Sequence, residues 1–213
     1  GAASAIARWT RQGKHGKYLV LTKGEAGIDS MNPEMSGPLR VQEQLESSRV
    51  VGVEDVEFLD YADGVIEYSL SLRRDISRVV RAFRPDVLVT TNYQLRWGFG
   101  GLNMADHRWA GLAVLDAARD AGNRWIFQEL LEEGLEPWGG VRMVLVGGSP
   151  DATHGVDVTD TIDLGIDSLR KHGVYIENLG VGFDPDSFLR WGASETGQQM
   201  DCDYAVSFEL VRV

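Results

Sequence analysis

The chain of 213 residues contains 43% hydrophobic, 25% charged and 9% aromatic residues, fractions that exclude a disordered, collagen-like or low-complexity protein. Its 21 lysines and arginines against 32 aspartates and glutamates give a formal net charge of −11 at pH 7. Because so acidic a chain is repelled by polyanions at long range, we expect neither nucleic acid nor an anionic membrane as a partner.

The first half of the chain alternates helical and strand patterns. Apolar residues at helical spacing predict a helix over residues 3–12, and Gly13 stands where that helix would stop. Residues 18–22 are a short apolar run, as expected of a strand buried on both faces of a parallel sheet. The polar stretch from residue 28 to residue 37 predicts a loop. The further elements predicted here are a helix over 39–52 and a strand over 56–59.

The second half continues the alternation. Apolar residues between positions 69 and 83 recur every three or four residues and predict a helix, which Pro85 ends. Residues 86–91 form another apolar strand, and a loop rich in glycine and aromatic residues follows over 92–104. The remaining predicted elements are a helix over 106–121, a strand over 141–146, a helix over 159–172 and a terminal strand over 204–213. Such alternation predicts a Rossmann-like α/β fold, a mostly parallel sheet flanked by helices, in a single domain over residues 1–213.

Cysteine content and hydropathy bear on the compartment. Cys202 is the single cysteine of the sequence, so no disulfide can form within the chain, which is compatible with a reducing compartment. No apolar run approaches the roughly 18 residues that crossing a bilayer requires. We therefore expect a cytoplasmic protein.

Three loops are candidates for the functional site, because ligands of open α/β sheets bind at the carboxyl ends of the strands. They are the loops over residues 22–27, 60–64 and 92–107. Gly24 and Gly27 flank Glu25 in the first of these loops, but their spacing matches no phosphate-binding motif. We favour a tight turn there over a nucleotide site.

Several polar side chains near these loops have two interpretations each. Asp106 either caps a helix N-terminus or belongs to a site, and His107 is either a first-turn surface histidine or a metal ligand. Arg40 forms either a solvated ion pair with Glu43 or a clamp for an anionic or carbonyl oxygen.

The aromatic residues and the other histidines leave the function open. Trp97 and Phe99 either belong to a core or an interface, or they wall a sugar or another amphipathic ligand. His15, His154 and His172 stand singly in the sequence, and we expect surface or turn positions for them. Taken alone, these residues favour neither an enzyme nor a binding module.

A series of short segments runs from the first residues of the chain to the last. They are residues 5–13, 20–27, 39–43, 58–64, 84–90, 105–108, 156–159, 169–172 and 204–208. In this order they resemble the LmbE-like, or PIG-L, family of zinc-dependent N-deacetylases. The resemblance implies a Rossmann-like α/β fold and the hydrolysis of an N-acetyl group from an N-acetylglucosamine-type substrate, a small-molecule amino sugar.

The resemblance also implies roles for five residues. His107 resembles a ligand of the metal, which is Zn²⁺ or another divalent metal, and Asp106 resembles the acidic catalytic partner beside it. Arg40 resembles the family's active-site arginine near the acetyl group. Asp63 and Glu25 match positions at the substrate mouth, which makes them expected substrate-binding residues.

Two departures from the family pattern are visible. Met104 occupies the place of a family histidine that helps to stabilise the oxyanion, and His154 is a candidate replacement. The family's Ala-His-Pro-Asp-Asp segment, with two metal ligands and the general base, does not precede Gly1. We therefore expect a chain without its N-terminal strand and metal-binding loop, which cannot by itself hold the zinc site. The alternatives are a non-catalytic sugar- or ligand-binding derivative of the fold and an inactive truncated chain, and a homo-oligomer is also open.

Overall fold

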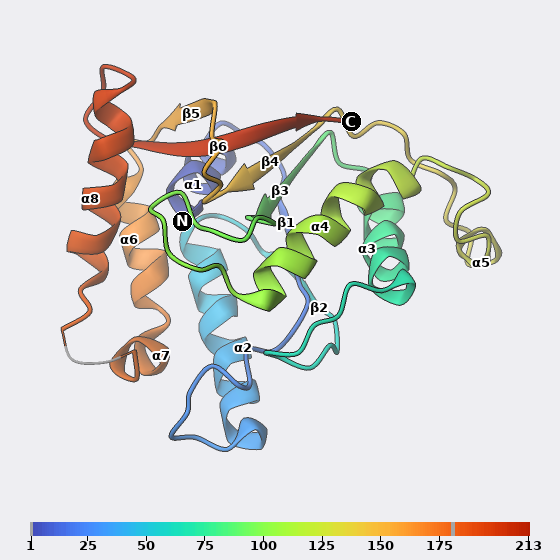
Figure 1. The fold of residues 1–213 in the computed structure, drawn as a ribbon, viewed down its shortest axis with the longest axis horizontal. Helices are drawn as coiled ribbons and strands as arrows, with labels where there is room; N and C mark the ends of the chain where they lie inside the picture. Colours follow the sequence, from blue (N-terminus) through green and yellow to red (C-terminus); the bar gives the residue numbers. More distant parts are fainter. Residues whose placement is uncertain (1, 180–181) are drawn as a thin grey trace. The chain divides into compact units, whose positions relative to one another are not determined.

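The computed structural model describes residues 2–179 and 182–213, so Gly1 and residues 180–181 of the predicted domain lie outside the described residues. The chain divides into two compact units. The first comprises residues 1–64 and 155–207, and the second comprises residues 65–154 and 208–213. Each unit combines helices with strands (Figure 1).

The first unit contains two parallel strands, β1 (Lys17–Val20) and β2 (Asp55–Phe58). Its helices are α1 (Ala3–Arg11), α2 (Pro33–Val50), α6 (Ile162–Arg170), α7 (Gly173–Glu177) and α8 (Pro185–Gln198). Helix α6 packs against α1, α2 and α8. In Figure 1, α1 and α2 are blue and α8 is red, so these helices come from the two ends of the sequence. The chain around α6 therefore lies next to α2, although more than a hundred residues separate the two.

Small residues allow α1 to approach α6 closely. Ala7 is fully buried and packs with Val51 and Val53 in the core of this unit. A Cβ atom at Gly165 of α6 would overlap the hydroxyl group of Ser4 in α1, so only glycine fits at this crossing.

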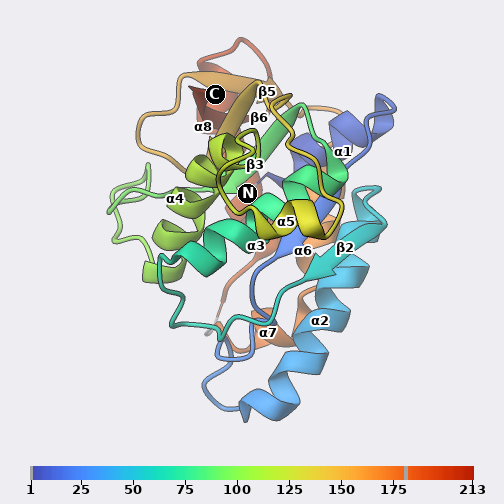
Figure 2. The same ribbon diagram turned by 90° about the vertical axis from the view of Figure 1, so that its right-hand side faces the viewer.

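The second unit is a sheet covered by helices. It contains α3 (Leu70–Phe83), β3 (Val87–Thr91), α4 (Ala105–Asp120), α5 (Glu129–Glu132) and β4 (Met143–Gly147). Strands β3 and β4 are parallel, whereas β4 is antiparallel to the end of β6 (Ala205–Arg212). Helix α4 packs against β3 and α3 (Figure 2). The side chains of Val144, Val146 and Phe208 are fully buried in its core.

The α/β class, with helices flanking partly parallel sheets, is confirmed. The strands form two sheets, β1-β2 and β3-β4-β6-β5, where β5 is His154–Asp157. The terminal strand β6 was expected, but its antiparallel pairing with β4 was not. The predicted helices over 3–12, 69–83 and 106–121 agree with α1, α3 and α4 to within one residue at each end. Among the described residues, no helix combines the length and the apolar character that spanning a membrane requires.

The predicted loop over residues 28–37 is wrong in its second half, because α2 begins at Pro33. The side-chain oxygen of Asn32 accepts a hydrogen bond from the backbone N–H of Glu34 at 2.9 Å and so caps the helix. Proline suits the first helical position, where no N–H donor is needed. The short elements β5, α5 and α7 and the longer α8 were not predicted.

Candidate functional site

The loops that follow β1 and β2 are joined through two carboxylates, Glu25 and Asp63. Glu25 Oε1 accepts a hydrogen bond from the backbone N–H of Asp63 at 2.9 Å, and Asp63 Oδ2 accepts one from the backbone N–H of Ala26 at 3.1 Å. Asp63 Oδ1 accepts a further hydrogen bond from the hydroxyl group of Thr22 at 2.9 Å. The two predicted substrate-binding carboxylates therefore lie together at the carboxyl ends of the parallel strands, and each one fixes the other's loop.

Arg40 lies against the first of these loops. Gly24 has a φ angle of +66°, and a Cβ atom there would lie 3.4 Å from Arg40 Nε. The expected tight turn after β1 is therefore confirmed at Gly24, whose left-handed backbone favours glycine. The turn places the backbone of Gly24, the residue before Glu25, beside the guanidinium group of Arg40.

The guanidinium group of Arg40 is held from three sides. Its Nη1 atom donates to Glu43 Oε2 at 2.5 Å and to His172 Nδ1 at 3.1 Å, and its Cζ atom lies 4.1 Å from the centroid of the Tyr175 ring. Glu43 Oε1 in turn accepts a hydrogen bond from the backbone N–H of Val174 at 2.8 Å. The side chains of Arg40 and Glu43 are only 16% and 10% exposed, so the alternative of a solvated ion pair is wrong.

His172 is neutral in this arrangement. Burial, and then the charge of Arg40, lowers the pKa of His172 from 6.5 to about 4. Because a guanidinium group can only donate hydrogen bonds, Nδ1 of His172 is the acceptor and the ring proton resides on Nε2. His172 lies in the turn between α6 and α7, as one of the two expected positions, but its side chain is only 13% exposed. Its partner Arg40 is 132 positions away in the sequence.

One donor of Arg40 is left over. Its Nε atom is buried and has no hydrogen-bond partner among the described residues. A buried N–H group without an acceptor costs about 1–3 kcal/mol, so a ligand oxygen at this position would be stabilised. Arg40 thus lies beside the loop that carries Glu25, in the same unit as Asp63. We call Glu43, His172 and Tyr175 the Arg40 clamp.

Asp106 and His107 lie in the second unit, in the first turn of α4. Asp106 is an acidic residue of the first turn and not the N-cap residue, and its Oδ1 atom accepts a hydrogen bond from the backbone N–H of Ile66 at 3.1 Å. The residue before the helix is Met104, whose side chain makes no capping hydrogen bond. His107 meets the ring of Trp97 edge to face, with 5.4 Å between the ring centroids.

The predicted residues do not assemble a metal site by themselves. Within residues 2–179 and 182–213, no three His, Cys, Asp or Glu side chains lie close enough together to hold a metal ion. His154, the candidate replacement for the family histidine, is exposed, and its Nδ1 lies 2.9 Å from the hydroxyl group of Thr153. The described residues therefore do not fit a complete metal site, and His107 is one candidate ligand.

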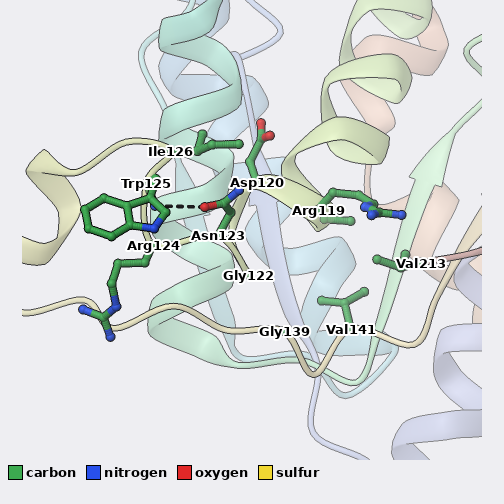
Figure 3. Close-up of a pocket in the computed structure, with 11 residues that line it drawn as sticks. Arg119, Asp120, Gly122, Asn123, Arg124, Trp125, Ile126, Gly139, Val141 and Val213 are labelled. Carbon is green, nitrogen blue, oxygen red and sulfur yellow. Dashed lines mark hydrogen bonds between the residues drawn. The ribbon is translucent and has the colours of Figure 1, made fainter.

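A cavity in the second unit lies away from these residues. It has a volume of about 690 Å³ and is lined by Asn123 and Trp125, among others, but by neither Asp106 nor His107 (Figure 3). Figure 3 shows the hydrogen bond that the backbone N–H of Trp125 donates to Asn123 Oδ1, at 2.9 Å. The buried guanidinium group of Arg81 donates to the backbone carbonyl of Asn123 at 2.9 Å and holds this segment in place. None of the predicted site residues lines the cavity.

Comparison with known proteins gives consistent matches. The family model PIG-L, described as GlcNAc-PI de-N-acetylase, matches residues 1–118. A diacetylchitobiose deacetylase from Thermococcus kodakarensis is 27% identical over 216 residues, which cover 99% of this chain and 78% of that protein.

Solved structures share the fold. The N,N'-diacetylchitobiose deacetylase from Pyrococcus horikoshii matches with a TM-score of 0.88 and 22% identity, over 100% of this chain and 78% of that one. The 4-carboxy-2-hydroxymuconate hydratase GalB from Pseudomonas putida matches with a TM-score of 0.75 and 16% identity, over 100% and 90% of the two chains. The fold alone therefore does not determine the reaction, and the family model, which matches more than half of the chain, is the more specific finding. The chain belongs to the PIG-L family.

Proposed function

We propose that this chain is a hydrolase that removes the acetyl group from an N-acetylglucosamine-type sugar. The observation that carries the proposal is the extent of the family match: residues 1–118 contain all five predicted site residues. The relative that is 27% identical is a deacetylase of diacetylchitobiose, which supports an amino-sugar amide as the substrate class.

In this proposal Arg40 binds and orients the substrate. The clamp fixes its guanidinium group, and Nε still has a hydrogen to donate to a carbonyl or hydroxyl oxygen. A donor held in place before the substrate arrives stabilises developing charge more than a mobile one, because no reorganisation is needed during the reaction. Glu25 and Asp63 shape the mouth beside it through their hydrogen bonds to the loop backbone.

The cofactor that we propose is Zn²⁺ or another divalent metal, with His107 as one ligand and Asp106 as its acidic neighbour. Such a metal, when bound, polarises a carbonyl group and lowers the pKa of bound water. The described residues supply no group of three ligands, so we assign no further ligand. A cytoplasmic location stays a prediction that rests on the single cysteine.

A non-catalytic sugar-binding derivative is the second candidate. It is favoured by Met104, which stands where the family has a histidine and is exposed, and by the incomplete metal group. Such a protein would hold the sugar through Arg40 without releasing acetate.

Acetate release, measured with and without metal, separates the two candidates. We expect the full-length protein, supplied with Zn²⁺, to release acetate from N,N'-diacetylchitobiose, and an excess of chelator to stop the release. Sugar binding without acetate release under both conditions would support the binding derivative instead. Acetate release that persists unchanged in excess chelator would show that the proposed metal is not needed.

A further inference from the structure

Two aromatic rings are stacked at the tip of the loop over residues 92–104. The rings of Trp97 and Phe99 are nearly parallel, at 9°, with 5.9 Å between their centroids. Phe99 is 72% exposed, so most of its side chain is open to solvent although one face meets Trp97. An open, flat aromatic face of this kind is unfavourable in water unless a ligand covers it. We call Trp97 and Phe99 the aromatic platform.

The platform is built on a fixed loop. Asn92 and Asn103 are almost completely buried, and Asn103 Nδ2 donates to the backbone carbonyls of Asn92 and Gln94 at 2.6 and 2.9 Å. The backbone N–H of Trp97 donates to the carbonyl of Gly101 at 2.8 Å, which closes the tip of the loop. Because the ring positions are set by these buried amides, a ligand would not have to order the loop on binding.

The platform also adjoins a predicted site residue. The ring of Trp97 stacks on that of Phe99. It also meets the ring of His107 edge to face, with 5.4 Å between the ring centroids. The three rings thus form a continuous row from the start of α4 to the exposed tip of the loop. A ligand with two linked rings could place one near His107 and the other on Phe99.

We propose that the aromatic platform is a subsite for the second ring of a neutral, β-linked amino-sugar oligosaccharide, next to the ring that carries the reacting acetyl group. This rests on the proposed deacetylase function and deepens it, because it makes an oligosaccharide the preferred substrate over a single sugar. A β-linked pyranose has a flat face of C–H groups that packs on an aromatic ring, while its hydroxyl groups stay in water. The net charge of −11 disfavours acidic sugars, which leaves neutral N-acetylated rings as the matching chemistry.

A second copy of the chain is the competing occupant. Leu95 and Leu102 are exposed on the same loop and enlarge its apolar surface. We favour the sugar because the stacked rings are nearly parallel and lead to His107, whereas a protein interface does not require such a row of rings.

The test compares two sugars on one variant. We expect Phe99→Ala to weaken the binding of N,N'-diacetylchitobiose about three- to tenfold, as loss of an aromatic contact does, and to leave that of N-acetylglucosamine within about twofold. Phe99→Tyr, which keeps the ring, restores the disaccharide affinity. Trp125→Ala, which removes another exposed ring of the second unit, changes neither affinity. Binding is followed by ligand-observed proton NMR.

The same spectra contain the signal of released acetate, so failure of the deacetylase proposal and failure of the subsite are separate results. The subsite proposal is overturned if Phe99→Ala leaves the affinity for the disaccharide unchanged, or lowers the affinities for both sugars equally. It is also overturned if the variant changes only the sedimentation of the protein, which would identify a second copy as the occupant.

Discussion

Arg40 shows how a charge can be kept inside a protein at low cost. Its guanidinium group contacts a carboxylate, a neutral imidazole and an aromatic face, so attraction to Glu43 and to the Tyr175 ring offsets the loss of hydration. A protonated histidine at position 172 would repel Arg40, so the arrangement requires the neutral form. The low pKa of His172 and its place in the Arg40 clamp therefore both follow from the burial of its side chain.

The pH dependence of stability follows from His172. Its pKa is about 4 in the folded chain against 6.5 for an ordinary histidine, so the unfolded chain binds more protons between these values. The free energy of unfolding is therefore expected to fall as the pH is lowered from 6.5 to 4, by about 3 kcal/mol in total, and to be independent of this group above pH 7. Urea denaturation across this range measures the effect.

The variant His172→Asn isolates this contribution. Its side-chain oxygen can accept the hydrogen bond from Arg40 but does not titrate, so the loss of stability between pH 6.5 and pH 4 should become smaller. His154→Asn, which changes an exposed histidine, is the control and should leave the profile unaltered. A His172→Asn profile identical to that of the parent chain would show that His172 is not the titrating group.

At the scale of elements, the long periodic segments could be predicted and the short or capped ones could not. The apolar stripe of α3 repeats over 14 residues and ends at Pro85, so both the helix and its end follow from the sequence. The elements β5, α5 and α7 contain only four or five residues, too few for a period to be visible. The start of α2 is signalled by Asn32 and Pro33, but the polar character of residues 28–37 predicts a loop, and Pro38 lies inside the helix.

The same reasoning explains what was missed in the site. Glu25 and Asp63 lie in the loops after β1 and β2, where the topology of an α/β sheet places functional side chains, whereas Arg40 lies in α2. His172 and Tyr175 reach Arg40 from a segment more than 130 residues later, and no local pattern records that contact. The buried role of Asn103 is equally invisible, because asparagine in a loop is ordinary.

The loop that carries the aromatic platform depends on Asn103. Replacing Asn103 by alanine removes two buried hydrogen bonds and leaves the carbonyls of Asn92 and Gln94 without this donor. We expect a loss of about 2 kcal/mol in the free energy of unfolding and faster amide hydrogen exchange over residues 94–101. Asn178→Ala removes two exposed hydrogen bonds, from Nδ2 to the backbone carbonyl of Val174 and from the Ser30 hydroxyl group to Oδ1, and should cost less than about 0.5 kcal/mol. Equal exchange rates in Asn103→Ala and the parent chain would contradict the assigned role.

At the scale of the whole molecule, the acidic charge and the family match point to the same class of ligand. A net charge of −11 disfavours polyanions, and the PIG-L model covers every predicted site residue. The predicted single domain over 1–213 stays a prediction, since the chain divides into two compact units. Arg40, Glu25 and Asp63 belong to the first unit, and Asp106 and His107 to the second.

Acetate release from N,N'-diacetylchitobiose by the full-length protein, as the parent chain and as its Arg40→Ala variant, in the presence of Zn²⁺, tests the central claim most directly. The account predicts release by the parent chain and a kcat/KM about 100-fold lower in the variant, as expected when one fixed donor to developing charge is lost. Arg49→Ala, which changes an exposed arginine of the same helix α2, should retain parent activity. Binding of the sugar without any acetate release by the parent chain, or equal activity in Arg40→Ala and Arg49→Ala, would contradict the account.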